Sequence, residues 1–219
     1  GEPVSSLNEK GKVYMIECWA TWCGPCIASI PHINELHKKF GDKGFVIVGM
    51  NVWEDGIEKA KDFVSGQGDK MSYRVAYSGG KGSEFENKWL KAADIKGIPR
   101  ALLVKDGKLV LSVHPSEVDD ALVDSMLKGE FDREAFSKKQ EAKEQRSASL
   151  RNKLGPLMRN GEWEKAKQFA NEDIGDSDPE LRDNILAAIA TNQGDWKAIQ
   201  AHAAKLETDA EREEYLGQV

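Results

Sequence analysis

The 219-residue sequence predicts an α/β domain, with a central mixed sheet flanked by helices, followed by an all-helical domain. Two observations predict this architecture. Short apolar runs rich in β-branched residues alternate with stretches of helical periodicity through roughly the first 130 residues. Beyond that point no strand pattern occurs, and charged residues and alanine dominate. We therefore expect an α/β domain over residues 1–130 and a helical domain over residues 131–219.

The strands expected in the first domain are short, apolar runs. They cover residues 12–19, 45–52 and 73–77, and then 101–104 and 108–113, which form a hairpin around Asp106-Gly107. The helices expected are 23–40, with a kink at Pro31, then 57–64, 84–92 and 116–127, the last capped by Ser116. This order predicts early parallel strands with crossover helices and an antiparallel edge.

The second domain begins with a polar stretch, 131–151, that predicts one long helix. After it, Gly161-Glu162-Trp163 and Gly194-Asp195-Trp196 lie 33 positions apart, with Asp178-Pro179 between them. This spacing is typical of TPR-like helix-turn-helix repeats; the alternative is two unrelated helices that begin alike. Because repeat surfaces bind peptides and proteins, we expect this domain to select or position partners.

Composition excludes several classes of function. The formal charge is −6, with acidic and basic residues interspersed, so no surface for nucleic acid or anionic lipid is expected. The longest apolar run, residues 13–20, contains Glu17 and is too short for a membrane-spanning helix. Three cysteines cannot build a disulfide-dense scaffold, but they can form one pair. No oligomeric state is indicated.

Cys23-Gly24-Pro25-Cys26 follows a predicted strand and opens a predicted helix. Two intervening residues within the first helical turn bring both sulfurs within disulfide reach. Unpaired N–H groups and the helix dipole favour a thiolate at Cys23, which makes Cys23 the nucleophile and Cys26 the resolving cysteine. The alternatives are a structural disulfide or half of a zinc site. Zinc needs two more ligands, and the four histidines are scattered, so no metal is expected.

At these residues the chain resembles the thioredoxin superfamily, over residues 1–130. The resemblance rests on the run 20–26 and on Gly97-Ile98-Pro99 directly before the strand at 101. It implies a thioredoxin-like fold, no cofactor, and a cis peptide before Pro99 that turns the Ile98 backbone toward the sulfurs to pair with a substrate strand. The substrate-binding residues expected are Trp22, Gly24, Pro25, Ile98, Pro99 and Arg100.

Glu17 lies six residues before Cys23 on a strand that is otherwise apolar. Burial raises the pKa of a carboxyl group, so Glu17 could relay a proton to or from Cys26. It matches the position where thioredoxins carry a buried acid. The alternative is a carboxylate that faces solvent at the end of a strand. Cys18, the next residue, faces the other side of the sheet and is expected to be a buried, inert thiol.

Within the superfamily, the chain resembles the TlpA/ResA-type reductases that act outside the bacterial cytoplasm. The resemblance rests on the run 19–26, on Pro31 and on an insert after the second strand. Two residues depart from that pattern: Ser29 replaces a glutamate, and Arg100 replaces the common threonine. A cation at Arg100 could stabilise the Cys23 thiolate or bind an acidic partner; the alternative is a loop arginine that points into solvent.

The function expected is thiol–disulfide exchange in the reducing direction, because Gly-Pro between the cysteines resembles the reducing members. This resemblance implies protein disulfide or dithiol substrates, a membrane thiol–disulfide reductase as electron donor, and a periplasmic or other extracytoplasmic location, with the cytoplasm as the alternative. A second hypothesis is a protein-interaction module with a vestigial or regulatory redox site. A peroxiredoxin-like peroxidase would need Thr-x-x-Cys, but Thr21 lies only two residues before Cys23.

Overall fold

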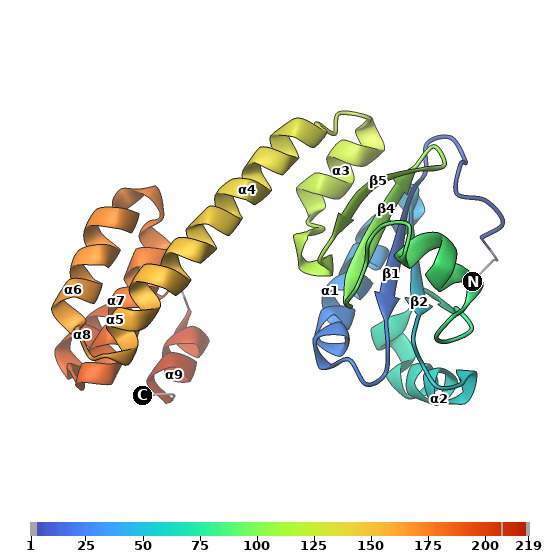
Figure 1. The fold of residues 1–219 in the computed structure, drawn as a ribbon. Helices are drawn as coiled ribbons and strands as arrows, with labels where there is room; N and C mark the ends of the chain where they lie inside the picture. Colours follow the sequence, from blue (N-terminus) through green and yellow to red (C-terminus); the bar gives the residue numbers. More distant parts are fainter. Residues whose placement is uncertain (1–3, 207, 218–219) are drawn as a thin grey trace. The chain divides into compact units, whose positions relative to one another are not determined.

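The computed structural model describes residues 4–206 and 208–217. The chain divides into two compact units, Gly1–Phe131 and Asp132–Val219, which we call unit 1 and unit 2. Figure 1 follows both units along the chain, from strands and helices in the first to helices alone in the second. Within the described residues, no helix combines the length and apolarity needed to cross a bilayer.

One mixed sheet forms the centre of unit 1, as predicted. Five strands within the described residues take the order β3-β2-β1-β4-β5. β1 pairs in parallel with β2, and β2 with β3, whereas β4 runs antiparallel to both β1 and β5. β1 is therefore the central strand. The strands are β1 (Val13–Trp19), β2 (Phe45–Asn51), β3 (Arg74–Tyr77), β4 (Arg100–Lys105) and β5 (Lys108–Val113).

Three helices of unit 1 pack on one face of this sheet: α1 (Gly24–Phe40), α2 (Ile57–Gln67) and α3 (Asp120–Lys128). The ring of Trp19 in β1 packs against Phe63 of α2, with 5.4 Å between centroids. Lys39 of α1 forms an ion pair with Asp120 of α3, and Figure 1 shows both helices on the same side of the sheet. The opposite face is covered by the segment that carries Phe85 and Trp89.

The β4–β5 hairpin turns through Asp106 and Gly107, as predicted. Their φ angles are 50° and 73°, so both residues adopt the left-handed conformation. A two-residue hairpin turn with two positive φ angles matches the right-handed twist of the strands it joins, and glycine adopts that conformation without steric cost. The turn thus explains why the hairpin closes at this dipeptide.

Two helix predictions in unit 1 need correction. Ser116 does not cap the last helix, because it lies inside a separate 3-10 turn, Pro115–Glu117, where its hydroxyl is 2.8 Å from Nδ1 of the His114 ring. The helix begins at Asp120, where the carboxylate of Asp119 accepts the N–H of Leu122 at 2.8 Å. The helix expected over 84–92 contains a π-helical turn, Glu86–Leu90.

Unit 2 contains only helices within its described residues. The carboxylate of Asp132 caps α4 (Arg133–Ser149), and a π-helical turn, Leu150–Leu154, leads into α5 (Gly155–Arg159). The regular part of the predicted 131–151 helix therefore ends at Ser149. The remaining helices are α6 (Trp163–Phe169), α7 (Pro179–Gln193), α8 (Trp196–Ala203) and α9 (Asp209–Gly217).

The core of unit 2 is apolar and built largely from small and β-branched side chains. Its buried members are Ala166, Phe169, Ala170, Ile174, Ile185 and Ile189. Both Gly-acid-Trp motifs begin a helix, α6 at Trp163 and α8 at Trp196. The two tryptophans differ in burial, because Trp163 packs against this core whereas Trp196 is exposed.

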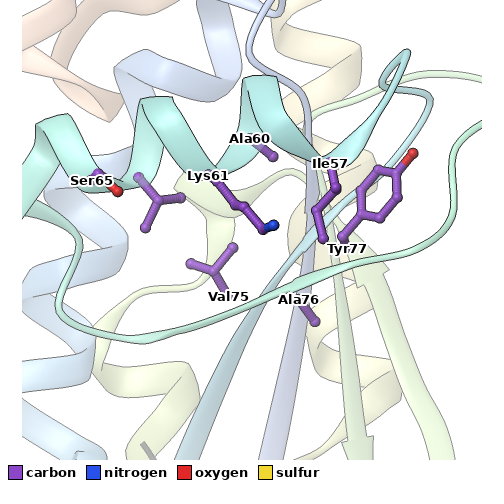
Figure 2. Close-up of a pocket in the computed structure, with 8 residues that line it drawn as sticks. Ile57, Ala60, Lys61, Ser65, Val75, Ala76 and Tyr77 are labelled. Carbon is purple, nitrogen blue, oxygen red and sulfur yellow. The ribbon is translucent and has the colours of Figure 1, made fainter.

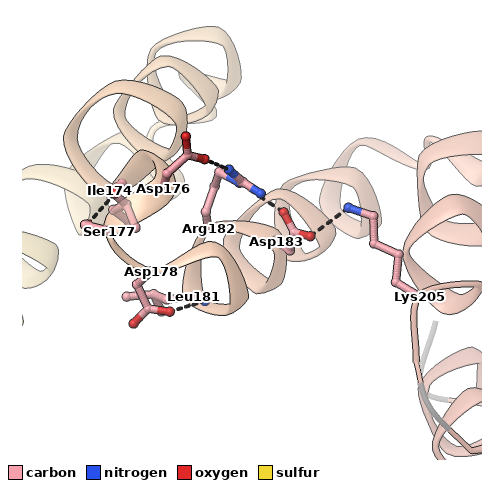
Figure 3. A network of polar contacts seen from close by, with 8 residues as sticks. All are labelled: Ile174, Asp176, Ser177, Asp178, Leu181, Arg182, Asp183 and Lys205. Carbon is pink, nitrogen blue, oxygen red and sulfur yellow. Dashed lines mark hydrogen bonds and ion pairs between the residues drawn. The ribbon is translucent and has the colours of Figure 1, made fainter.

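A network of polar contacts surrounds the start of α7 (Figure 3). Asp178 accepts the N–H of Leu181 at 2.9 Å and so caps the helix. Arg182 donates to Asp176 and Asp183, each at 3.0 Å, and Lys205 pairs with Asp183 at 2.7 Å. These contacts join the start of α7 to the turn before it and to the segment after α8.

Candidate active site

Cys23 and Cys26 are joined by a disulfide, with 5.2 Å between their Cα atoms. Cys23 is the N-cap of α1, and Cys26 lies in the first turn of that helix. The helix begins here because Cys23 is extended, its sulfur accepts the N–H of Cys26 at 3.2 Å, and Pro25 needs no partner for its nitrogen. The strand-to-helix position predicted for the pair is thus the position it occupies.

The helix N-terminus gives Cys23 an environment that favours negative charge. No acidic residue lies in the first turn of α1, whereas its last turn carries His37, Lys38 and Lys39. Free N–H groups and the helix dipole stabilise a thiolate at an N-cap. Cys26 is 1% exposed and Cys23 is 5% exposed, so an incoming partner meets Cys23 first.

Glu17 is buried in the middle of the sheet, 1% exposed, and neither carboxylate oxygen has a hydrogen-bond partner within the described residues. Burial raises its pKa to about 8. It therefore does not face solvent at a strand end. A carboxyl group with a pKa near neutrality populates both protonation states, which is what proton transfer requires.

Small neighbours leave room for the Glu17 side chain. In the sheet, Glu17 lies beside Gly49 of β2 and Ala101 of β4. A Cβ atom at Gly49 would lie 3.0 Å from the Tyr73 ring and 3.3 Å from the Trp19 indole, so this position accepts only glycine without displacement. Burial, and then the charge of Glu17, raises the pKa of Tyr73. The acid and these two aromatic rings thus share one interior region.

The residues expected to bind substrate lie at one end of β1 and β4. β1 and β4 run antiparallel, and Cys18 near the end of β1 pairs with Arg100 at the start of β4. The chain that leaves β1 toward Cys23 and the loop that enters β4 therefore lie at the same end of these two strands. The Ile98–Pro99 peptide is cis. Trp22 is 58% exposed, Gly24 and Pro25 are exposed, and Ile98, Pro99 and Arg100 are half-buried.

Arg100 lies on the face of the sheet opposite Glu17. It pairs with Cys18, and directly paired residues point to the same side. Cys18 is fully buried, as predicted, and burial raises the pKa of its thiol; the charge of Glu17 also raises it, and that of Arg100 lowers it. The Nε of Arg100 is buried without a partner within the described residues.

Glu54 was not identified from the sequence. It lies in the loop between β2 and α2, is 3% exposed, and accepts the N–H of Thr21 at 2.8 Å. A glutamate in such a loop has the pattern of a solvated side chain, so the sequence carries no signal for its burial. Across residues 4–206 and 208–217, no group of His, Cys, Asp or Glu side chains could hold a metal ion.

Comparison with known proteins agrees with this geometry. The Redoxin family model matches residues 1–125. The thiol-disulfide oxidoreductase ResA of Bacillus thuringiensis subsp. konkukian is 30% identical over 129 residues, which cover 58% of this chain and 69% of that protein. ResA of Bacillus subtilis is 27% identical over 127 residues, covering 58% of this chain and 66% of that protein.

Among solved structures, a thiol:disulfide interchange protein of the thioredoxin family from Chlorobium tepidum is 26% identical. The match has a TM-score of 0.44 and covers 54% of this chain and 81% of that one. The family model matches more than half of this chain, and the match to the first ResA covers more than two thirds of that relative. The chain therefore belongs to the Redoxin family, and it is a ResA-like thiol–disulfide oxidoreductase of the thioredoxin superfamily.

Proposed function

We propose that the Cys23–Cys26 pair reduces disulfides in other proteins, with Cys23 as nucleophile and Cys26 as resolving cysteine. The observation that carries this proposal is the position of the pair at the N-terminus of α1. There the Cys23 sulfur already accepts a backbone N–H and has no acidic neighbour in the first helical turn. Both features favour the thiolate that attacks a disulfide.

The reaction begins with both cysteines reduced. The Cys23 thiolate attacks one sulfur of the substrate disulfide, which forms a mixed disulfide and releases the other substrate sulfur as a thiolate that takes up a proton. Cys26 loses its proton and attacks the Cys23 sulfur. The Cys23–Cys26 bond forms and the second substrate thiol leaves. Two electrons pass to the substrate, and an external dithiol returns them by the reverse exchange.

Glu17 is the proposed proton acceptor for Cys26. Its ionised form can take the thiol proton when Cys26 attacks, and its neutral form can return that proton when the pair is reduced again. Three observations support this role: the burial of Glu17, its pKa of about 8, and its position on the face of the sheet against which α1 packs. A change from carboxyl to amide would remove the acceptor while keeping the shape.

The substrate is proposed to lie against Trp22, Gly24, Pro25 and the loop Ile98–Pro99–Arg100. The exposed indole of Trp22 offers apolar contact, and the Ile98 backbone can pair with an extended substrate segment. Arg100 adds a cation at the start of β4, where its half-buried side chain can attract an acidic substrate or stabilise the Cys23 thiolate.

Insulin reduction tests this function. The wild-type chain, supplied with a small dithiol, should accelerate the precipitation of reduced insulin chains, and Cys23→Ser should lose this activity. An inactive wild type would instead support a protein-interaction module with a vestigial redox site. The reducing direction predicts a reduction potential nearer about −270 mV than about −120 mV. A value near that of strong oxidants would contradict it.

Unit 2 is proposed to be a TPR-like domain that selects or positions protein partners. Two helices that begin with Gly-acid-Trp and the exposed Trp196 support a binding surface. The setting proposed is extracytoplasmic, with a membrane thiol–disulfide reductase as electron donor. Deletion of residues 131–219 should spare the reduction of small disulfides and impair turnover of the native partner; unchanged partner turnover would assign unit 2 a purely structural role.

A further inference from the structure

Glu54 lies at a sharp corner after β2. The preceding residue, Trp53, has a φ of 56°, in the left-handed region that bulky side chains rarely adopt. Trp53 packs against the cluster of Ile16, Cys18 and Leu90, which holds it in that conformation. Unfavourable backbone conformations of this kind persist where the surrounding structure fixes them, often beside a functional site.

Contacts with the backbone carbonyl of Glu54 also fix this corner. The carbonyl oxygen of Glu54 accepts the hydroxyl of Tyr77 at 3.4 Å. A Cβ atom at Gly80 would lie 2.9 Å from the same oxygen, so the chain at Gly80 approaches this carbonyl as closely as a glycine allows. Glu54 is therefore held by its backbone from β3 and from the loop after it.

The side chain of Glu54 points toward the turn between Ala20 and Cys23. Its Oε2 accepts the backbone N–H of Thr21 at 2.8 Å, and the Asn51 amide approaches the same oxygen at 3.5 Å. Thr21 lies two residues before Cys23, whose own N–H donates to Ala20 O at 3.1 Å. The carboxylate thus fixes the turn from Ala20 to Cys23 at its middle.

We propose that Glu54 is a positioning residue for thiol–disulfide exchange. By holding the Thr21 N–H, its buried side chain fixes the turn that sets the Cys23 sulfur at the N-terminus of α1 and presents Trp22 beside it. Glu54 acts through the loop and contacts neither sulfur nor substrate. This inference rests on the exchange reaction proposed above for Cys23, because it concerns how that sulfur is placed.

Glu54→Gln and Glu54→Leu separate the hydrogen bond from the charge. Both variants lack the carboxylate charge, but only glutamine can still accept the Thr21 N–H. Compared with Glu54→Gln, we expect Glu54→Leu to lower kcat/KM for insulin reduction about tenfold. The pH midpoint for alkylation of reduced Cys23 by iodoacetamide should rise by about one unit, because the sulfur is less well held at the helix N-terminus. Equal behaviour of the two variants in both measurements would overturn the proposal.

Asn34→Leu is the matched control. Asn34 is also a buried polar residue that holds a loop, since it accepts the N–H of Ser72 at 2.9 Å and donates to Asp69 O at 2.8 Å. That loop precedes β3 and does not carry Cys23. Asn34→Leu should lose comparable stability yet keep the wild-type alkylation midpoint. A midpoint that rises as far as in Glu54→Leu would reduce the role of Glu54 to general stability.

Glu54→Asp decides the question if Glu54→Leu does not fold. Aspartate keeps the charge but is one methylene shorter, so it should lose the Thr21 contact and lower kcat/KM, as Glu54→Leu does. Wild-type values in both measurements would overturn the proposal.

The experiments also distinguish failure of the reductase function from failure of the positioning role of Glu54. A wild type that does not reduce insulin, while Cys23 alkylation still responds to Glu54→Leu, contradicts the reductase and supports the positioning role.

Discussion

The two units differ in where they keep their polar side chains. Among the described residues, the buried polar side chains are Glu17, Asn34, Asn51 and Glu54, all in unit 1. In unit 2, the charged contacts of Arg182, Asp183 and Lys205 involve side chains that are partly or fully exposed. Unit 1 thus buries a few polar side chains within an apolar core, whereas no polar side chain of unit 2 is buried within its described residues.

This difference indicates that unit 1 carries the catalytic site. Burying a polar group without full compensation destabilises a fold, so such groups persist where a reaction or a loop requires them. Unit 1 keeps Glu17 without a hydrogen-bond partner and uses Glu54 to hold the loop before Cys23. Within its described residues, unit 2 has no buried acidic side chain, and its buried polar atoms without a hydrogen-bond partner are Nη2 of Arg146 and the hydroxyl of Tyr215. Its contribution is proposed to lie at its surface. Four substitutions and one control variant test the contrast.

Glu17→Gln should give the largest change in stability. The pKa of Glu17 is raised from 4.5 to about 8 by burial, so the folded chain binds its proton more tightly than the unfolded chain. The contribution of Glu17 to the free energy of unfolding therefore falls as pH rises from about 4.5 to about 8, by on the order of 5 kcal/mol, and this contribution is constant outside that window. Glu17→Gln should remove this fall, which urea denaturation between pH 4 and pH 9 can measure.

Glu35→Gln provides the control for that comparison, because Glu35 is exposed on α1 of the same unit. It should leave the pH profile of the wild type in place. If Glu17→Gln also keeps the wild-type profile, Glu17 is not the buried acid that makes unit 1 sensitive to pH.

Truncating one buried side chain in either core should lower the free energy of unfolding by a similar amount, roughly 2–5 kcal/mol. Leu103→Ala empties a fully buried position in β4, and Ile189→Ala empties one in α7. Because each unit has a core of its own, the rate of amide hydrogen exchange, measured by mass spectrometry, should rise only in the unit that carries the substitution. Faster exchange throughout the chain in either variant would mean that the units unfold together.

Asp183→Asn should have the smallest effect. It removes the ion pairs of Asp183 with Arg182 and Lys205, which are partly exposed to water and therefore weakly stabilising. We expect the free energy of unfolding, measured by urea denaturation, to fall by less than about 1 kcal/mol at 0.1 M salt. The fall should be smaller still at 1 M salt. A loss as large as that of Ile189→Ala would show that polar contacts, rather than apolar packing, determine the stability of unit 2.

The sequence predicts the sheet and the cysteine site well because their signals are local. The strands are short apolar runs bounded by turn residues, and Asp106-Gly107 matches one turn type. The spacing of Cys23 and Cys26 after a strand determines where both sulfurs lie on α1. The raised pKa of Glu17 also follows from its place on an apolar strand.

The errors arise where a residue's role depends on distant neighbours. Ser116 has the right residue type for a helix cap, but its hydroxyl contacts the His114 ring and Asp119 caps α3 instead. Glu54 resembles a solvated loop residue until the Trp53 corner turns it toward Thr21, 33 positions earlier in the chain. Residue type and spacing do not encode such contacts, which only the assembled fold brings together.

Trapping the mixed disulfide tests the central claim most directly. Cys26→Ser removes the resolving thiol, so the reduced variant, mixed with a disulfide-containing peptide, should form a stable covalent adduct. Mass spectrometry of its proteolytic fragments should find the peptide bound through Cys23, with Cys18 unmodified in the core. Attachment at Cys18, or no adduct while the wild type still reduces the peptide, would contradict the assignment of Cys23 as nucleophile.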